Sequence, residues 1–279
     1  MDNYTLITGA SEGLGKALAI KCAERNMNLI LVSLPGIELY QLACYIRRRY
    51  AVKVCEFETD LSRESDRLYL ARMIRENNLP VNMLINNAGI GGTLDFSETD
   101  FYIWQKQIQL NITGLVHLTH LLLPELKRHP HSYIMNVSSL AVFFYLPQKQ
   151  VYGATKSFIY FFSKSLRREL KPYNVHVSVL CPGGINSNPL HYLVNHGSTN
   201  IARSSSMTPE EVAITAINGL LKEKERIIPG KWNRLFIYLD KILPAFIKDK
   251  LIWKQVRNMK QQYAEALMQG NISILKKSA

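Results

Sequence analysis

Thr8-Gly-Ala-Ser-Glu-Gly-Leu-Gly15 is the stretch that decides the fold. A short apolar run beginning at Tyr4 leads into it, and a helical run from Lys16 to Arg25 follows it. A strand, a glycine-rich turn and a helix in this order predict a binding site for the phosphates of a dinucleotide.

Each glycine of this motif has a separate task. Gly9 permits the tight turn, Gly13 lets the backbone approach a pyrophosphate, and Gly15 allows the helix to pack closely. The phosphates then lie at the helix N-terminus, where free N–H groups and the helix dipole favour anions. The spacing is G-x-x-x-G-x-G rather than the commoner G-x-G-x-x-G.

Strand-like and helical runs alternate along the rest of the chain. We expect further strands at residues 28–33, 52–57, 81–85, 132–137, 175–180 and 226–228. We expect helices at 37–50, from a Ser62 cap to 77–78, at 97–123 before Pro124, at 150–170 and at 210–221 after Pro209. The pattern predicts an α/β protein: one Rossmann-like, doubly wound parallel sheet of about seven strands, with helices on both faces. We assign residues 1–230 to this domain and 231–279 to a basic, helical C-terminal extension.

A tyrosine and a lysine stand one helical turn apart in Tyr152-Gly-Ala-Thr-Lys156. A phenol titrates near 10, too high for useful proton exchange at neutral pH, and a neighbouring ammonium lowers that pKa. The pair therefore predicts a general acid/base that acts on a carbonyl or alcohol oxygen. Ser138 and Ser139 end the strand expected at 132–137, at the edge where open α/β sheets hold their ligands.

Jointly, these motifs resemble a known family. From Thr8 to Gly15, through Asp60, Asn86-Asn-Ala-Gly89, Asn111, Ser139, Tyr152 and Lys156 to Pro182-Gly183, the sequence is similar to the short-chain dehydrogenases/reductases. The resemblance covers about residues 3–230.

The resemblance implies a catalytic set of Asn111, Ser139, Tyr152 and Lys156. It gives Tyr152 the acid/base role and Lys156 two tasks, lowering the tyrosine pKa and binding the nicotinamide ribose. Ser139, thirteen residues before Tyr152, is preferred to Ser138 and would hydrogen-bond the substrate oxygen. Asn111 would lie at a backbone kink that supports a proton relay.

The resemblance also implies an NAD(P)(H) site. Asp60 would contact the adenine, and the segment Cys181-Pro-Gly-Gly-Ile185 would hold the nicotinamide. The expected cofactor-binding residues are Gly9, Ser11, Glu12, Gly13, Leu14, Gly15, Ser33, Asp60, Leu61, Asn87, Ala88, Gly89, Tyr152, Lys156, Pro182, Gly183, Ile185 and Ser187.

The choice between NAD and NADP stays open. An acidic residue after the second strand would bind the ribose 2′-hydroxyl of NAD, and an arginine would accept the phosphate of NADP. The sequence has Ser33-Leu34-Pro35 there, which is neither. Glu12 could repel a 2′-phosphate.

Composition limits the compartment and the partners. The glycine loop begins too close to Met1 for a secretory signal, and no run of eighteen apolar residues appears. The four cysteines are scattered, and His117 and His120 have no further ligand nearby, so we expect no metal site. These features indicate a cytoplasmic protein.

The formal charge of +12 is concentrated in the tail. From Lys222 onward there are 13 Lys and Arg against 5 Asp and Glu, a net +8. Trp232 to Trp253 alternates apolar and basic residues, which suits peripheral membrane contact, a helix over the substrate pocket, or a subunit contact. The basic residues lack the aromatic interleaving of a nucleic-acid surface, so we expect no nucleic-acid partner.

The function indicated is an NAD(P)-dependent oxidoreductase that interconverts a carbonyl and a secondary alcohol on a fairly apolar small molecule. The steroid-, acyl- and ketone-like classes stay open. Phe143 to Leu146 would line an apolar pocket or belong to the core, and 188–207 would form a lid. By resemblance, the helices bearing Asn111 and Tyr152 would pair in a homodimer or homotetramer. The alternative function is a dinucleotide-binding regulatory or nucleic-acid-interacting module without turnover.

Overall fold

A computed structural model of the protein describes residues 3–187 and 204–244, together with positions 247, 250, 253, 257 and 258. Its centre is a seven-stranded parallel sheet in the order β3-β2-β1-β4-β5-β6-β7. The strands are β1 (Tyr4–Thr8), β2 (Asn28–Ser33), β3 (Val54–Glu58), β4 (Val81–Asn86), β5 (Ser132–Val137), β6 (Val175–Leu180) and β7 (Arg226–Ile227). The doubly wound α/β fold predicted from the sequence is confirmed.

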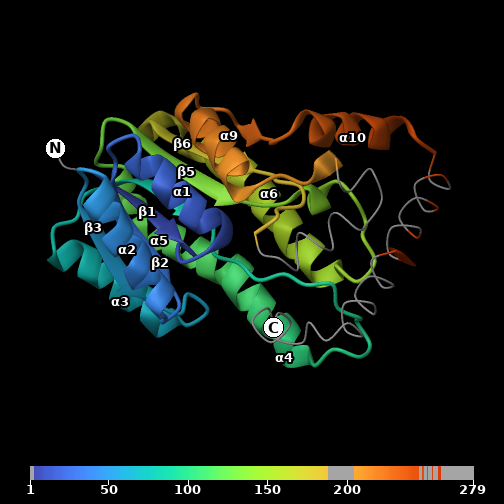
Figure 1. Ribbon diagram of the computed structural model, residues 1–279, viewed down its shortest axis with the longest axis horizontal. Helices are drawn as coiled ribbons and strands as arrows, with labels where there is room; N and C mark the ends of the chain where they lie inside the picture. Colours follow the sequence, from blue (N-terminus) through green and yellow to red (C-terminus); the bar gives the residue numbers. More distant parts are fainter. Residues whose placement is uncertain are drawn as a thin grey trace.

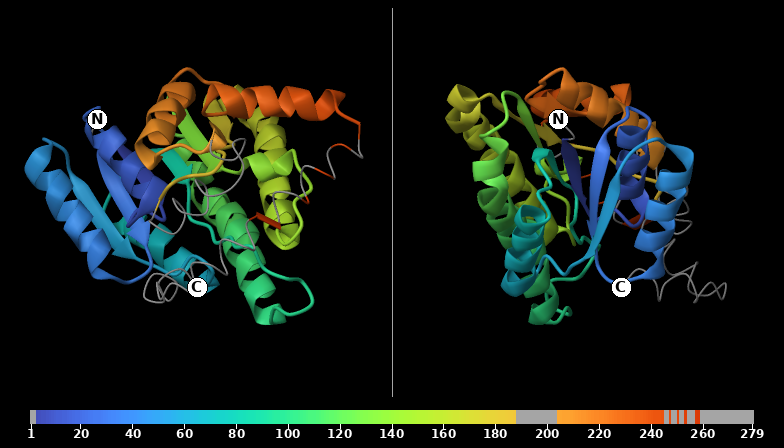
Figure 2. Two further views of the ribbon diagram at one scale, coloured as in Figure 1. Left: turned by 45° about the vertical axis from the view of Figure 1, so that its right-hand side comes forward. Right: turned by 90° about the vertical axis from the view of Figure 1, so that its left-hand side faces the viewer.

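Helices cover both faces of the sheet, which gives the three layers visible in Figures 1 and 2. They are α1 (Gly13–Ala23), α2 (Ile37–Arg49), α3 (Glu64–Glu76), α4 (Phe101–Ile108), α5 (Leu115–Leu126), α6 (Gln150–Leu170), α9 (Pro209–Leu221) and α10 (Lys231–Ile242). A π-helical segment, Gln109–Gly114, joins α4 to α5. Short 3-10 turns occupy Leu140–Val142 and Lys171–Tyr173.

The core consists of two apolar layers, one on each face of the sheet. One joins α1, α2 and α9 to residues such as Ile7 and Leu31, and the other joins α3, α5 and α6 to residues such as Leu6 and Ile134. Adjacent strand residues thus point to opposite layers, which explains why the strands are apolar at nearly every position rather than at alternate ones.

The helix expected at 97–123 is wrong in both bounds. It begins at Phe101, because the Asp100 carboxylate caps it by accepting a hydrogen bond from Tyr102 N at 2.7 Å. It continues past Pro124, which lies inside α5. Pro124 is exposed, so water can hydrogen-bond the carbonyl of His120 that proline leaves without a helical donor.

Other boundaries differ by a few residues. Ser62 does not cap α3: its N–H and its hydroxyl both donate to Asp60, at 3.0 and 2.6 Å, and Arg63 takes the cap position. The strand expected at 52–57 is shifted to Val54–Glu58. The lid predicted at 188–207 lies largely outside the described residues.

Candidate active site

The predicted site residues gather where the strands end. Gly9 directly follows β1 and Asn87 directly follows β4, whereas Ser139 and Pro182 are the second residues after β5 and β6. Parallel strands place all their carboxyl ends at one edge of the sheet, and β1 and β4 are neighbours at its centre. The sequence motifs are therefore neighbours in space although they are far apart in the chain.

The glycine loop is shaped so closely that side chains do not fit. A Cβ on Gly15 would lie 1.8 Å from the carbonyl oxygen of Gly9, and a Cβ on Gly9 would lie 2.9 Å from the Cα of Ala88. Gly9 and Gly13 adopt φ values of +64° and +52°, which favour glycine. The loop delivers the first turn of α1, with Leu14 buried, Ser11 half-buried and Glu12 exposed.

Thr8 is a structural residue of this loop that sequence reasoning missed. Its Oγ1 accepts hydrogen bonds from the N–H groups of Asn87 (3.0 Å) and Ala88 (2.9 Å). The Asn87 amide donates in return to the carbonyls of Thr8 (3.0 Å) and Gly9 (3.1 Å). These four bonds fix the segment after β4 against the glycine loop. The sequence signal that could have identified Thr8 is its hydroxyl group at the last position of β1.

A buried amide pair lies beneath this contact. Asn86 Nδ2 donates to Asn136 Oδ1 at 2.8 Å and to Thr119 Oγ1 at 3.0 Å, and Asn136 Nδ2 donates to Ser163 Oγ at 2.9 Å. The bonds connect β4 with β5, α5 and α6. Because buried amides are costly unless paired, this network holds the central strands in one arrangement.

Tyr152 and Ser139 face one another. The Ser139 hydroxyl lies beside the Tyr152 phenol, and it accepts a hydrogen bond from Ala141 N at 3.1 Å. Burial raises the pKa of Tyr152, and the nearby Ser139 hydroxyl acts in the lowering direction. The pKa is therefore shifted in the direction opposite to the one expected, and the lowering effect expected of Lys156 stays a prediction.

Ser138 and Ser139 make different contacts. The Ser138 side chain is buried and its hydroxyl donates to the carbonyl oxygen of Lys156 at 2.8 Å. It therefore joins β5 to α6 as a structural contact. Only Ser139 of the two reaches the phenol.

Lys156 is a buried ammonium at the centre of the site. Its Nζ lies 5.7 Å from the centre of the Tyr152 ring and donates to the carbonyl oxygen of Val137 at 2.9 Å. Burial lowers its pKa to about 8, against a small opposing effect of Cys181. Lys156 therefore loses its proton at a pH only slightly above neutral.

Asn111 lies within the π-helical segment, so the predicted backbone kink is present. Its side chain is fully buried: Oδ1 accepts from Ile90 N at 2.9 Å, and Nδ2 donates to Ile90 O at 2.9 Å and to Thr155 Oγ1 at 3.1 Å. A Cβ on Gly89 would lie 3.1 Å from Asn111 Oδ1 and 3.3 Å from Lys156 Nζ. The amide and the ammonium therefore border the same small space.

The segment after β6 reaches this edge as well. Pro182 O accepts from Leu140 N at 2.8 Å, Ile185 forms a parallel bridge with Met207, and a Cβ on Gly13 would lie 3.3 Å from Ser187 Cβ. Asn233, at the start of α10, was missed by sequence reasoning. Its amide donates to Ser205 O (3.1 Å) and Pro229 O (2.8 Å), and a Cβ on Gly183 would lie 2.8 Å from its Nδ2.

Asp60, Leu61 and Ser33 are held by local bonds. Burial acts to raise the pKa of Asp60, but the Ser62 hydrogen bonds and the charges of Arg63 and Lys106 outweigh it, and the pKa is lowered. Leu61 is buried, and its carbonyl accepts from Arg67. Ser33 Oγ donates to Leu34 O at 2.9 Å.

Comparison with known proteins identifies the family. The sequence profile described as short chain dehydrogenase matches residues 3–196. The chain belongs to this family. Very-long-chain 3-oxoacyl-CoA reductase of Vanderwaltozyma polyspora is 28% identical over 292 residues, which is 93% of this chain and 82% of that protein. Estradiol 17-beta-dehydrogenase 11 of Mus musculus is 29% identical over 244 residues, covering 86% and 79%.

A solved structure supports the same assignment. The short-chain dehydrogenase from Sphingobium yanoikuyae in complex with NADPH is 27% identical, with a TM-score of 0.73 over 86% of this chain and 94% of that chain. As a member of the short-chain dehydrogenase family, the protein is an oxidoreductase.

The loop after β4 covers the ring of Tyr152. A Cβ on Gly91 would lie 3.0 Å from Tyr152 Cε2, so this loop packs directly on the phenol ring. The aromatic segment from Phe143 to Leu146, which follows Ser139, is less enclosed than a pocket wall or a core segment would be. The Phe143 ring packs against Tyr160 of α6 at 5.5 Å, and Tyr145 is 96% exposed.

The ring nitrogen Nδ1 of His117 accepts a hydrogen bond from Arg67 Nε at 3.0 Å, so a protein group already occupies this nitrogen. Among the helices in the described part of the chain, none has the length and apolarity that a bilayer crossing needs.

Proposed function

We propose that this short-chain dehydrogenase interconverts a carbonyl and a secondary alcohol on a fairly apolar small molecule, with NAD(P)(H) as cofactor. The observation that carries the proposal is the pairing of Ser139 with the Tyr152 phenol beside the buried Lys156. Serine and tyrosine hydroxyls that lie side by side are suited to hold one substrate oxygen between them.

The chain's residues fit a dinucleotide. Gly9, Gly13 and Gly15 form a cradle that side chains would fill, and it opens at the N-terminus of α1. Free N–H groups there are ready donors to phosphate oxygens. The related Sphingobium enzyme binds NADPH, which supports a nicotinamide cofactor. When bound, the cofactor supplies or accepts the hydride.

The protein's own residues handle the proton. In the reductive direction, the Tyr152 phenol donates its proton to the substrate oxygen, and Ser139 hydrogen-bonds the same oxygen. The phenol, whose pKa burial raises, holds this proton at neutral pH. Lys156, whose pKa is about 8, is placed to return a proton.

The route for that proton leads toward Asn111. The Asn111 amide and the Lys156 ammonium both border the position of a Gly89 Cβ. A water bridging them would connect the lysine to the Ile90 carbonyl, which Asn111 Nδ2 already hydrogen-bonds. Replacing Lys156 with alanine should therefore lower both the turnover rate and the cofactor affinity.

The relatives suggest two substrate classes. One is named as a reductase of very-long-chain 3-oxoacyl-CoA and the other as an estradiol dehydrogenase, and both substrates carry an oxygen on a large apolar body. The decisive experiment is a turnover screen of 3-oxoacyl-CoA esters, ketosteroids and simple bulky ketones, each with NADH and NADPH. Turnover absent from every combination at high enzyme concentration, with cofactor bound, would contradict the proposal and favour a binding module.

The exposed apolar side chains of α4 and α6 support a homodimer. Phe101 and Tyr102 of α4 and Phe161 of α6 are exposed, the last by 75%. We expect light scattering to give at least twice the monomer mass and Phe161→Asp to lower it. Tyr145→Asp, a change at a fully exposed aromatic outside these helices, is the control. A monomeric wild type would contradict the dimer.

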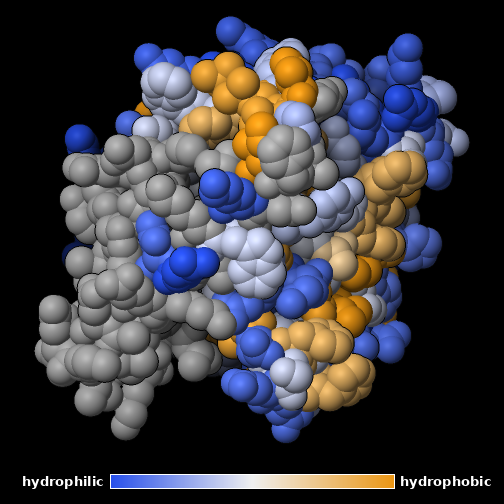
Figure 3. Space-filling model, turned by 90° about the vertical axis from the view of Figure 1, so that its right-hand side faces the viewer, coloured by the Kyte–Doolittle hydropathy of each residue, from blue (hydrophilic) through white to orange (hydrophobic). Residues whose placement is uncertain are grey.

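α10 is the part of the described chain best suited to a lipid surface. It exposes Trp232, Leu235, Tyr238, Leu239 and Ile242, with Lys231 and Arg234 beside them. Figure 3 shows apolar side chains gathered on the face of the molecule that bears this helix. We propose peripheral membrane association of a protein that is otherwise cytoplasmic.

Co-sedimentation with anionic vesicles tests this association. Leu235→Ser with Ile242→Ser should abolish it, whereas Leu68→Ser, an exposed leucine on α3, should not. Equal sedimentation of both variants would contradict the role of α10.

A further inference from the structure

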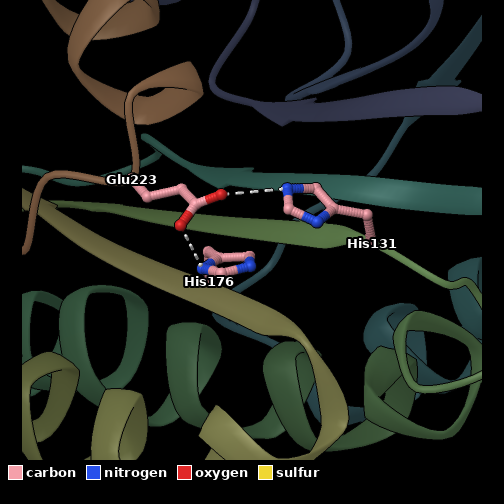
Figure 4. A group of neighbouring side chains, drawn as sticks. All are labelled: His131, His176 and Glu223. Carbon is pink, nitrogen blue, oxygen red and sulfur yellow. Dashed lines mark ion pairs between the residues drawn. The ribbon is translucent and has the colours of Figure 1, made fainter.

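His131, His176 and Glu223 meet at the end of the sheet opposite the active site (Figure 4). His131 immediately precedes β5, His176 is the second residue of β6, and Glu223 follows α9. β5 has six residues, so this cluster lies roughly 20 Å from the Ser139 end of the strand. The dehydrogenase reaction makes no use of these side chains.

Their separations are close to those of metal ligands. His131 Nε2 lies 3.3 Å from Glu223 Oε1, and His176 Nδ1 lies 3.2 Å from Glu223 Oε2. One ligand atom from each residue can be chosen so that all three lie within 4.8 Å of one another. Two ligands about 2.1 Å from a tetrahedral zinc ion are roughly 3.4 Å apart, so small side-chain rotations bring all three to bonding distance.

The sheet holds the two imidazoles on one face. Tyr133 pairs in register with His176 across β5 and β6, and His131 is two residues before Tyr133. The Tyr133 ring contacts both histidine rings, at 4.8 Å for His131 and 5.9 Å for His176, and the histidine rings are 4.4 Å apart. Packing against an aromatic ring limits the rotation of each imidazole and lowers the entropy lost on binding.

The turn after α9 directs Glu223 toward the histidines. Glu223 has φ +54°, a left-handed conformation that costs energy for a residue other than glycine. Arg167 Nη2 donates to the Glu223 carbonyl at 2.7 Å, and Glu223 N donates to Leu220 O at 2.8 Å. The main chain is therefore fixed while the carboxylate is directed at the two rings, as Figure 4 shows.

The site is open to solvent. The side chains of His131 and Glu223 are 43% and 42% exposed and that of His176 is 22% exposed, so an ion can enter from solvent.

We propose that His131, His176 and Glu223 form a binding site for a divalent transition-metal ion, with Zn²⁺ as the expected ion. Two imidazoles and one carboxylate are a ligand set that zinc accepts, and water would complete its coordination. The ion would tie the turn between α9 and β7 to the starts of β5 and β6. Its effect is on stability rather than on the chemical step. This site would revise the expectation of no metal, because its ligands are separated in the sequence by 45 and 47 residues.

Zinc titration of the full-length, untagged protein tests the site. We expect isothermal calorimetry to show one Zn²⁺ per chain, and affinity to fall at least tenfold in His131→Ala and in Glu223→Gln. Both side chains are partly exposed and lie outside the core, so the variants should fold, which circular dichroism in chelator would verify. Zinc should raise the Tm of the wild type and not that of either variant.

Three controls separate this site from others. His120→Ala removes an exposed histidine from α5, and Cys44→Ser and Cys55→Ser remove the two partly accessible thiols. All three should bind zinc as the wild type does. Wild-type affinity in His131→Ala, or no zinc binding at all, would show that the cluster is only an ion-pair network and would overturn the proposal.

Discussion

The side-chain amide of Asn111 is hydrogen-bonded to both main-chain polar groups of Ile90, each at 2.9 Å. This reciprocal pair connects the π-helical segment to the loop after β4, the loop that packs on Tyr152. A π-helical turn inserts an extra residue into a helix and is frequent at functional sites. Here it turns a buried amide toward the loop rather than along the helix.

Asn111→Ala should lower both stability and activity. The change leaves the part-buried N–H of Ile90 without its partner and removes one of the two donors to the Ile90 carbonyl, the other being Gln107 Nε2 at 3.2 Å. An unpaired buried donor costs about 1–3 kcal/mol of unfolding free energy. Urea denaturation measures this, and the rate should fall because the relay is interrupted. Asn77→Ala, at the exposed end of α3, should change neither quantity by a comparable amount. An unaltered rate would remove Asn111 from the mechanism.

Tyr152→Phe should abolish turnover and leave cofactor affinity nearly unchanged. The ring still packs against Gly91, but the acid/base oxygen is gone. Steady-state kinetics and cofactor titration by fluorescence measure the two effects. The matched control is Tyr160→Phe on the same helix, whose ring packs against Phe143. Near wild-type kcat in the Tyr152 variant would refute the proposed acid/base role.

Stability should carry a signature of Lys156 at alkaline pH. Its pKa is about 8 in the folded protein against 10.5 for an ordinary lysine, so between these values the unfolded chain binds more protons. The free energy of unfolding should therefore rise with pH over this range, by up to about 3 kcal/mol, relative to Lys156→Met.

Comparison with Lys156→Met isolates the lysine, because the buried thiols act in the opposite direction. Burial raises the pKa of Cys22 and of Cys181 to about 12, which lowers stability as pH rises above 9. Both proteins share that loss. Parallel stability curves for the wild type and the variant, measured by urea denaturation between pH 7 and 10.5, would mean that the lysine does not titrate as stated.

Cofactor preference should respond to Glu12 and Leu34. Both side chains are exposed, and neither offers a cation to a ribose 2′-phosphate. Like charges about 6 Å apart repel by a few kcal/mol at an effective dielectric near 20, less with salt. Glu12→Lys with Leu34→Arg should shift the kcat/KM ratio toward NADPH at least tenfold, or about 1.4 kcal/mol.

A charge change elsewhere on α1 controls for the overall field. Glu24→Lys makes the same change in charge as Glu12→Lys at the other end of the helix, about 18 Å away, and should leave the NADPH to NADH ratio as it was. If the double variant also left it unchanged, Ser33 or other residues would have to recognise the ribose.

Much of the fold was readable from the chain because its signals are local. Apolar runs between turn residues defined β1, β2, β5 and β6 to the residue, and α6 likewise. The glycine motif predicted which edge of the sheet bears the site, because its spacing constrains the backbone over only eight residues. Errors came where a side chain decided the boundary, as when Ser62 bonded Asp60 instead of capping α3.

The sequence by itself determined which groups the site contains: a glycine cradle, a serine, and a tyrosine one turn from a lysine. Only the tertiary structure decided how these groups are charged and supported. Desolvation, which no pattern encodes, raised the pKa of Tyr152 against the expected direction. Contacts between distant segments placed Asn233 against Gly183 and Glu223 beside two histidines. Such contacts depend on which strands become neighbours in the sheet, and burial and pairing distances exist only once the chain has folded.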